Sequence, residues 1–357
     1  MERLLRRSFF MAILFVGLLL TNGEAATLDV APSGYPYTSI QAAIDAASGG
    51  DTVLVHDGTY VESISFLGKA ITVKSEKGSA STSIDGDGAS VVVNFGNGEG
   101  EGSVLDGFTV KGGTSGTWGA GIICYYSSPT ITNCTISGNT ATGMGGGIYS
   151  DWASSPTLTS CVITGNTAGA GGGIFSWDSA PTIVNCVISG NTATGNGGGI
   201  VTWQSSPTIV NCTISGNTAT NGGGIYCQES TATVKNSILW GNATDEIYLA
   251  AGGSATVTYS DVKQDGYAGI NGNISQDPLF VGPANGDFSL QLNSPCIDAG
   301  TSDSAPATDM KGNIRFDSPH VSNRGGGTYP YYDWRKGLPK WGPARGLRSK
   351  ISRSFSW

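Results

Sequence analysis

Similar blocks recur in the middle of the chain at an almost constant spacing. Each block opens on Pro-Thr followed by Ile or Leu, and successive prolines stand 27, 25 and 26 residues apart, at Pro129, Pro156, Pro181 and Pro207. The block continues, with small variations, as x-Asn-Cys-x-Ile-Ser-Gly-Asn-Thr-Ala and then reaches a Gly-Gly-Gly-Ile stretch. A period of this length is typical of a solenoid, in which each repeat packs against its neighbours.

Apolar residues flank polar ones over short runs inside each block, for example from Ile183 to Ile188. This is the periodicity of a strand, and no helix-length amphipathic segment separates successive strands. Parallel strands without intervening helices must be joined by short turns, so the chain coils and each coil pairs with the next at about 4.8 Å. The sequence therefore predicts an all-β fold, a right-handed parallel β-helix solenoid with a short N-terminal capping helix.

Equivalent residues of stacked coils should form ladders along the rod. Stacked asparagines satisfy one another's amides, and glycine blocks permit tight or left-handed backbone at a corner. We expect a cysteine ladder, an asparagine ladder and an isoleucine ladder, made of Cys134, Cys161, Cys186 and Cys212, of Asn139, Asn166, Asn191 and Asn217, and of Ile148, Ile174, Ile200 and Ile225.

The seven cysteines admit three interpretations. Four of them fall in register with core isoleucines, which favours free, inward-facing thiols that act as small buried hydrophobic groups. Disulfides between adjacent coils and a metal site are the alternatives, and no Cys-x-x-Cys pair occurs. Cys124, Cys227 and Cys296 lie outside this ladder, and the pattern assigns them no role.

Residues 1–25 are predicted to be an export signal peptide. Arg3, Arg6 and Arg7 precede an apolar run that ends at Leu20. That run is shorter than the roughly 20 residues that a membrane-spanning helix requires, and no later stretch is long and apolar enough. We therefore expect a secreted protein, extracellular or on the cell surface, without a transmembrane segment.

A single β-helix domain is expected over residues 26–323. A short helix over residues 38–47 would cap its first coil, because an exposed coil end invites aggregation. Regular repeats are expected over about 112–245 and irregular closing coils over about 246–323. Residues 324–357 lack periodicity, which predicts a loosely ordered basic tail.

Charge is distributed unevenly along the chain. Residues 26–323 hold 8 Lys and Arg against 24 Asp and Glu, whereas residues 324–357 hold 8 Lys and Arg against Asp333 alone. An acidic rod repels nucleic acid and polyanionic glycans such as pectate, unless calcium bridges the charges or the tail binds. We expect no nucleic-acid partner, and the sequence sets no oligomeric state.

Three stretches resemble known families. Residues 37–44 (Tyr-Thr-Ser-Ile-Gln-Ala-Ala-Ile), with the Gly-Asp-Thr-Val that follows at 50–53, resemble the opening of pectin-lyase-like β-helix proteins. The Asn-Cys-x-Ile-Ser-Gly-Asn units, followed by Gly-Gly-Gly-Ile, also resemble the repeats of polymorphic outer membrane proteins, which are adhesins. Residues 293–300 and 309–313 resemble the closing region of β-helix proteins of the choice-of-anchor type, but Trp334-Arg335-Lys336 departs from their usual ending.

The resemblance implies a fold and leaves the function open, because these groups include lyases, hydrolases and adhesins. Lyases of this fold need acidic calcium ligands and an Arg or Lys base, yet no Lys or Arg occurs between Lys111 and Lys235. The histidines, His56 and His320, lie outside the repeats. Hydrolases need paired carboxylates, for which Asp151 and Asp178 are weak candidates, because spacing alone does not place two carboxylates across a glycosidic bond.

A polar and aromatic stripe is the strongest candidate for a site. Aromatic rings stack on the apolar faces of sugars and carboxylates accept hydrogen bonds from hydroxyls, so the stripe suits carbohydrate. The alternative is that these rings only cover a loop or pack on the coil. The stripe comprises the residues three and four places after each block isoleucine, namely Tyr125, Tyr126, Asp151, Trp152, Trp177, Asp178, Trp203 and Gln204, with Glu229 on the last coil.

Asp85-Gly86-Asp87-Gly88 is the only other candidate for a ligand site. Asp85 and Asp87 would suit calcium in a turn, but the segment lacks the further acidic ligands of a dedicated calcium loop. An ordinary Gly-Asp turn is favoured, so no cofactor is expected, with calcium as the one alternative.

Taken together, these patterns favour a non-catalytic protein that binds polysaccharide or a partner surface along its stripe. A polysaccharide-degrading lyase or glycoside hydrolase and a structural, adhesin-like rod are the alternatives.

Overall fold

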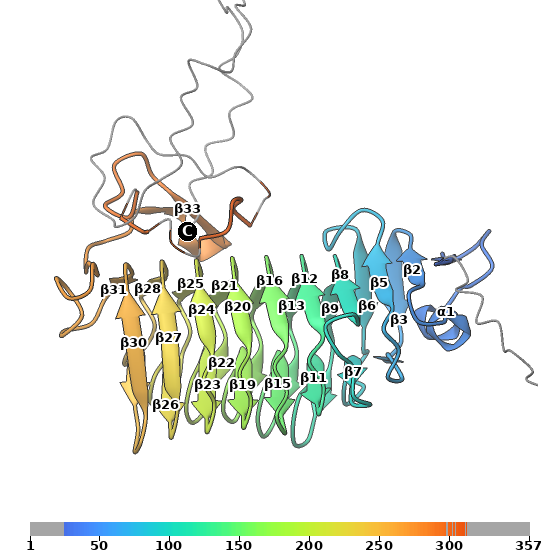
Figure 1. Cartoon of the computed structure of the whole chain (residues 1–357), viewed down its shortest axis with the longest axis horizontal. Helices are drawn as coiled ribbons and strands as arrows, with labels where there is room; N and C mark the ends of the chain where they lie inside the picture. The colour runs from blue at the N-terminus through green and yellow to red at the C-terminus, as the bar shows by residue number, and fades with distance from the viewer. Residues whose placement is uncertain (1–24, 298, 302, 304, 311, 313–357) are drawn as a thin grey trace, which may run out of the picture.

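The computed structural model describes residues 25–297, 299–301, 303, 305–310 and 312. The predicted export signal, apart from its last residue, and the predicted basic tail lie outside the described residues. Inside them the chain coils into an all-β solenoid whose strands lie side by side along a rod (Figure 1). All pairings among the long sheets are parallel, as the sequence predicted.

Two long sheets form adjacent sides of the rod. Sheet A has ten strands, which in spatial order are β1 (Thr27–Val30), β2 (Thr52–Val55), β5 (Thr72–Ser75), β8 (Val104–Asp106), β12 (Thr130–Thr132), β16 (Thr157–Thr159), β20 (Thr182–Val184), β24 (Thr208–Val210), β27 (Thr231–Lys235) and β30 (Ser254–Thr258). Sheet B has nine, which are β3 (Gly58–Val61), β6 (Thr82–Asp85), β9 (Thr109–Lys111), β13 (Thr135–Ser137), β17 (Val162–Thr164), β21 (Val187–Ser189), β25 (Thr213–Ser215), β28 (Ile238–Trp240) and β31 (Asp261–Val262).

Two further sheets complete each central coil, which runs from sheet A through B and D to C. Sheet D has four short strands, β10 (Thr114–Ser115), β14 (Thr140–Ala141), β18 (Thr167–Ala168) and β22 (Thr192–Ala193). Sheet C has eight, β4 (Ile64–Ser65), β7 (Val93–Phe95), β11 (Ile122–Tyr125), β15 (Ile148–Asp151), β19 (Ile174–Trp177), β23 (Ile200–Trp203), β26 (Ile225–Gln228) and β29 (Ile247–Leu249).

Like residues lie over like in the core. Strand register pairs Ile148 with Ile174, Ile174 with Ile200 and Ile200 with Ile225, which confirms the isoleucine ladder. Every second residue of a strand points to the same face, so these isoleucines fill the interior together with those of sheets A and B. Burial of this continuous apolar column is the main favourable contribution to folding.

The asparagine ladder is also confirmed. Asn191 Nδ2 donates to Asn217 Oδ1 at 2.9 Å, and Asn217 Nδ2 donates to Asn242 Oδ1 at 2.9 Å. The carboxylate of Glu246 ends the ladder by accepting from Asn242 Nδ2 and from Gly241 N. Burial raises the pKa of Glu246.

All seven cysteines are free and buried. For the four cysteines of the ladder this confirms the interpretation as inward-facing thiols, whereas the sequence assigned no role to the other three. The Cys161 backbone N–H contacts Cys186 Sγ at 3.4 Å, and the Cys186 N–H contacts Cys212 Sγ at 3.5 Å. Burial raises the pKa of the Cys186 thiol well above its usual value, so the thiol stays protonated and unreactive. The next two coils continue the same ladder with Ser237 and Ser260.

A short helix, α1 (Ile40–Ala46), closes the first coil as predicted. Its N-cap is Ser39, whose side chain accepts from Ala42 N at 3.3 Å. Ile40, Ala43 and Ile44 are buried against the core. The Glu62 carboxylate accepts from Ile40 N at 2.8 Å and thus satisfies a helix N–H that has no partner inside the helix.

At the other end one further coil, with β29, β30 and β31, follows residue 246, and a short loop then covers the end of the rod. Gln264 uses its side-chain amide to pair with both the N–H and the C=O of Ile247, each at 2.9 Å, which protects the free edge of sheet C. The Asn273 side chain accepts from Ser260 N at 2.9 Å and donates to Val257 O at 2.8 Å, so it extends the cysteine and serine ladder by one step.

The segment beyond Asp277 folds back along the rod and does not form the closing coils that the sequence predicted there. It forms an antiparallel pair, β32 (Phe280–Gly282) and β33 (Asp287–Leu290), joined by the 3-10 turn η1 (Pro283–Asn285). Figure 1 shows β33 beside the rod. Asn236 exchanges two 2.8 Å hydrogen bonds with the Thr301 backbone, and Asn185 Nδ2 donates to Thr308 O at 3.1 Å. Asparagines in the turns between sheets A and B therefore hold this segment against the rod.

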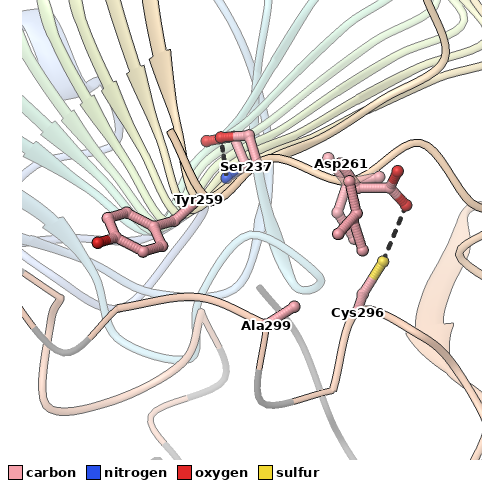
Figure 2. A pocket seen from close by; sticks show the side chains of 9 residues that line it. Ser237, Tyr259, Asp261, Cys296 and Ala299 are labelled. Atoms are coloured by element: carbon pink, nitrogen blue, oxygen red, sulfur yellow. Dashed lines mark hydrogen bonds between the residues drawn. The ribbon is translucent and has the colours of Figure 1, made fainter. Parts of the chain in front are cut away.

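A buried thiol and a buried carboxyl meet where the returning segment contacts the last coil. Cys296 Sγ donates to Asp261 Oδ2 at 3.0 Å, beside a small pocket that Tyr259 and Ala299 also line (Figure 2). Asp261 Oδ1 accepts from Gln276 N at 3.1 Å. Burial, the largest cause, raises the pKa of Asp261 to about 6.

This raised pKa predicts a pH-dependent stability difference. The native state binds the Asp261 proton more tightly than the unfolded chain, so Asp261 destabilises the fold progressively as pH rises from about 4 to about 6. We expect the stability of Asp261→Asn relative to the wild type to rise across this window by on the order of 2 kcal/mol. Urea unfolding at several pH values measures it, and exposed Asp265→Asn controls for the change in net charge. A flat difference would contradict the prediction.

Candidate functional site

The predicted stripe lies on the outer face of sheet C, where each strand ends. Strand register pairs Tyr125 with Asp151, and it pairs Trp203 with both Trp177 and Gln228. The residue that follows each of these has a positive φ of 41° to 56°, which turns the chain toward sheet A. The stripe therefore consists of two columns, the first being Tyr125, Asp151, Trp177, Trp203 and Gln228 and the second Tyr126, Trp152, Asp178, Gln204 and Glu229.

Three rings at the N-terminal part of the stripe form what we call the aromatic cluster. Tyr125, Tyr126 and Trp152 remain 37%, 55% and 48% exposed. The Tyr126 and Trp152 rings lie 5.4 Å apart at 31°, while Tyr125 meets Tyr126 edge to face at 4.9 Å. Two neighbouring coils thus expose three large rings in contact with one another.

Asp151 lies beneath this cluster and is engaged by the protein. It is 7% exposed, and its two oxygens accept from Tyr149 Oη at 2.8 Å and from Trp152 N at 2.6 Å. Burial and the adjacent Asp151 raise the pKa of the Tyr149 hydroxyl, which keeps it a donor. Asp151 therefore holds the backbone of Trp152 in place and is poorly exposed to a substrate.

Asp178, the proposed acid–base partner of Asp151, is exposed in the other column. The two carboxylates differ in burial and sit at different positions of the strand end. This arrangement gives the pair no support as a glycosidase centre.

The remaining aromatic residues of the stripe pack against each other. The Trp177 and Trp203 rings stack at 5.1 Å and 9°, so one face of each is covered by the other. Trp177 Nε1 donates to Gln204 Oε1 at 3.2 Å, and Gln204 Nε2 donates to Glu229 Oε2 at 2.9 Å. The covered faces of these two tryptophans therefore pack on the coil surface, as the alternative interpretation of the stripe expected.

Two residues beside the aromatic cluster escaped sequence reasoning. Tyr149 lies on the outer face of sheet C, buried in an external apolar row with Phe175, Val201 and Tyr226. Trp118 stacks on Tyr149 at 6.1 Å and is itself 53% exposed. The signal was present, because Tyr149 directly follows a ladder isoleucine and Trp118 directly precedes the equivalent Gly-Ala-Gly-Ile stretch.

The stripe also concentrates the charge of the central coils. Asp151, Asp178 and Glu229 are the only charged residues in residues 112–234, and all three lie in its two columns. The exposed members, Asp178 and Glu229, give this face a negative potential with no neighbouring Lys or Arg of the same coils.

The candidate calcium turn has the geometry of an ordinary aspartate turn. Asp85 Oδ1 accepts from Asp87 N at 3.0 Å, and Asp85 Oδ2 pairs with Lys111 Nζ at 3.2 Å. A lysine ammonium therefore occupies one side where a cation would bind. No group of three or more metal-ligating side chains occurs within the described part of the chain.

Residues 120–282 match the family model for the right handed beta helix region. The fold is a right-handed parallel β-helix. Solved structures similar to this β-helix include pectin methylesterase from Aspergillus niger in deglycosylated form, at 17% identity over 69% of this chain and 82% of that one, with a TM-score of 0.41. Pectate lyase Pel9A is 18% identical over 80% of this chain and 94% of its own, with a TM-score of 0.45. No curated protein matches the β-helix by sequence.

The resemblance to β-helix proteins is thus confirmed for the fold. The resemblances to polymorphic outer membrane proteins and to the choice-of-anchor type remain predictions. No helix in the described part of the chain has the length and apolarity to cross a membrane.

Proposed function

We propose that this β-helix is a secreted or cell-surface protein that binds polysaccharide, without catalysis, through the aromatic cluster. The observation that carries the proposal is the exposure of three large rings, Tyr125, Tyr126 and Trp152, side by side on a rigid rod. Contiguous exposed apolar surface often marks a binding site, and the faces of aromatic rings suit the apolar faces of pyranose rings.

The cluster is organised before any ligand binds. Asp151 accepts from the Trp152 backbone, and the backbone around it pairs with the coils on either side, as Ala153 N does with Asp178 O at 2.7 Å. A preorganised surface loses little conformational entropy on binding, which favours affinity. The phenol hydroxyls of Tyr125 and Tyr126 can form hydrogen bonds with sugar hydroxyls.

The structure favours binding over hydrolysis on this face. The candidate acid–base residues are a buried Asp151 used by the protein and an exposed Asp178 in the other column. The central coils between Lys111 and Lys235 have no basic side chain to act as a lyase base. A structural or adhesive rod remains the second hypothesis, and it predicts no glycan affinity at the cluster.

Binding to a panel of soluble polysaccharides, with products assayed for new reducing or unsaturated ends, tests the proposal. We expect Tyr126→Ala/Trp152→Ala to weaken binding about tenfold or more, because each lost stacking contact contributes about 1 kcal/mol. Tyr248→Ala is the matched control, since Tyr248 is a partly exposed ring on the same sheet at its far end.

Affinity equal to the wild type in the double variant would rule out the cluster as the binding site. Turnover that disappears in Asp151→Asn or Asp178→Asn would overturn the non-catalytic assignment. For the proposed export, N-terminal sequencing of the protein recovered outside the cell should begin near Ala26, and retention of residues 1–25 in a cytoplasmic protein would contradict it.

A further inference from the structure

We infer that the stripe selects polysaccharides that carry free amino groups and discriminates against polyuronates. This inference rests on the proposed function, because it assigns a ligand class to the same surface. It begins with the order of side chains in the second column, which reads along the rod as Tyr126, Trp152, Asp178, Gln204 and Glu229.

Successive members of this column lie on successive coils, about 4.8 Å apart. The aromatic cluster is therefore followed by an acid, an amide and a second acid along one line. A glycan chain that stacks on Tyr126 and Trp152 and runs along the rod passes over Asp178 and then Glu229. Asp178 and Glu229 lie about 10 Å apart by the same spacing, so one chain can contact both.

Both carboxylates retain capacity for a ligand. Asp178 is exposed, and its side chain makes no hydrogen bond or ion pair with any described residue. Glu229 is exposed, and Gln204 occupies one of its oxygens, Oε2, at 2.9 Å. Gln204 thereby orients Glu229 while leaving Oε1 to accept from a ligand.

The electrostatics of the face decide the sign of the selectivity. Residues 112–234 contain no Lys or Arg, so no side chain of these coils neutralises Asp178 or Glu229. A ligand ammonium gains charge-assisted hydrogen bonds to carboxylates, whereas a uronate is repelled. Exposed ion pairs contribute only up to about 1 kcal/mol each, so the preference should be about tenfold for two pairs and should weaken with salt.

Matched oligomers of glucosamine and N-acetylglucosamine test the inference, since they share ring and linkage and differ in charge. Titration calorimetry at mildly acidic pH and low ionic strength should show the full-length wild type binding the glucosamine oligomer about tenfold more tightly. Oligogalacturonate of equal length should bind more weakly than both. Asp178→Asn/Glu229→Gln should reduce the glucosamine preference to about twofold or less without weakening the N-acetylated oligomer.

The controls separate the two claims. Glu101→Gln/Asp265→Asn changes the net charge equally at exposed positions away from the stripe and should leave the preference intact. Because every variant keeps residues 324–357, the basic tail contributes equally to all of them. Wild-type preference for the N-acetylated or galacturonate oligomer, or a preference that survives in the carboxylate variant, overturns the inference. Loss of the proposed function itself would appear differently, as affinity for all oligomers that is insensitive to Trp152→Ala.

Discussion

Gly172→Ala is expected to destabilise the β-helix by about 3 kcal/mol or more. Gly172 is the middle residue of a Gly-Gly-Gly-Ile stretch, and a Cβ placed on it would lie 2.6 Å from Thr192 O and 2.7 Å from Gly198 O. Both oxygens belong to backbone of the following coil. That backbone is fixed by ladder hydrogen bonds, including Gly172 N to Gly197 O at 3.1 Å, so it cannot move aside without breaking pairs.

Urea unfolding followed by circular dichroism measures this effect. Gly116→Ala is the matched control, because a Cβ there meets no neighbour within 4 Å, and it should change stability by less than about 1 kcal/mol. Equal stability of Gly172→Ala and the wild type would contradict the prediction, because it would mean that this corner can accommodate a Cβ. Solenoids can unfold in parts, so coincidence of the circular dichroism and tryptophan fluorescence transitions should be checked first.

Asn191→Ala should be comparably damaging for a different reason. The fully buried Asn191 side chain accepts from Asn166 N and Asn166 Nδ2 at 3.0 Å each. It also donates to Ile163 O and Asn217 Oδ1 at 2.9 Å each. Truncation leaves these groups without partners in a site closed to water, and each such loss destabilises by about 1–3 kcal/mol. We expect a total of about 4 kcal/mol.

Asn221→Ala is the appropriate comparison, because Asn221 Nδ2 donates to Asn196 Oδ1 at 2.9 Å in a surface ladder that water can reach. It should change the free energy of unfolding by about 1 kcal/mol or less. The same urea titration serves both variants. A small effect of Asn191→Ala, similar to that of Asn221→Ala, would mean that water replaces the buried amide and that the ladder is not a major source of stability.

These two positions show why much of this fold was predictable. A residue that recurs every 25 to 27 places has one role in every coil, so Asn191 and Gly172 each repeat an environment that their neighbours reveal. The capping helix was predicted in a different way, from the local signals of the Ser39 N-cap and one apolar face, and it ends at Ala46 with Ala47 as its C-cap, before the glycines that the sequence suggested. The buried serines at Ser154, Ser179, Ser205 and Ser230 form a further row that was overlooked, since serine carries a weaker signal than cysteine or asparagine.

The candidate site was predictable only in part. Periodicity placed Trp152, Asp178 and Glu229 on one line, but it did not distinguish an exposed ring from a stacked one. Trp177 and Trp203 stack on each other and are only partly exposed, whereas Tyr126 and Trp152 remain 55% and 48% exposed although their rings also lie close together. Asp151 is held by Tyr149, a neighbour on the same strand. Strand geometry predicts that Tyr149 points outward, but it does not predict that Trp118 covers Tyr149.

The sequence alone determined the coil, its register and its three ladders, because strand pairing between repeats places each residue over its counterpart one period away. Tertiary structure alone decided which stripe residues face solvent and where the final segment lies. Contacts such as Asn185 with Thr308 and Cys296 with Asp261 join residues without any period between them. Such contacts arise from packing of a non-repeating chain on a repeating surface, and no spacing in the sequence encodes them.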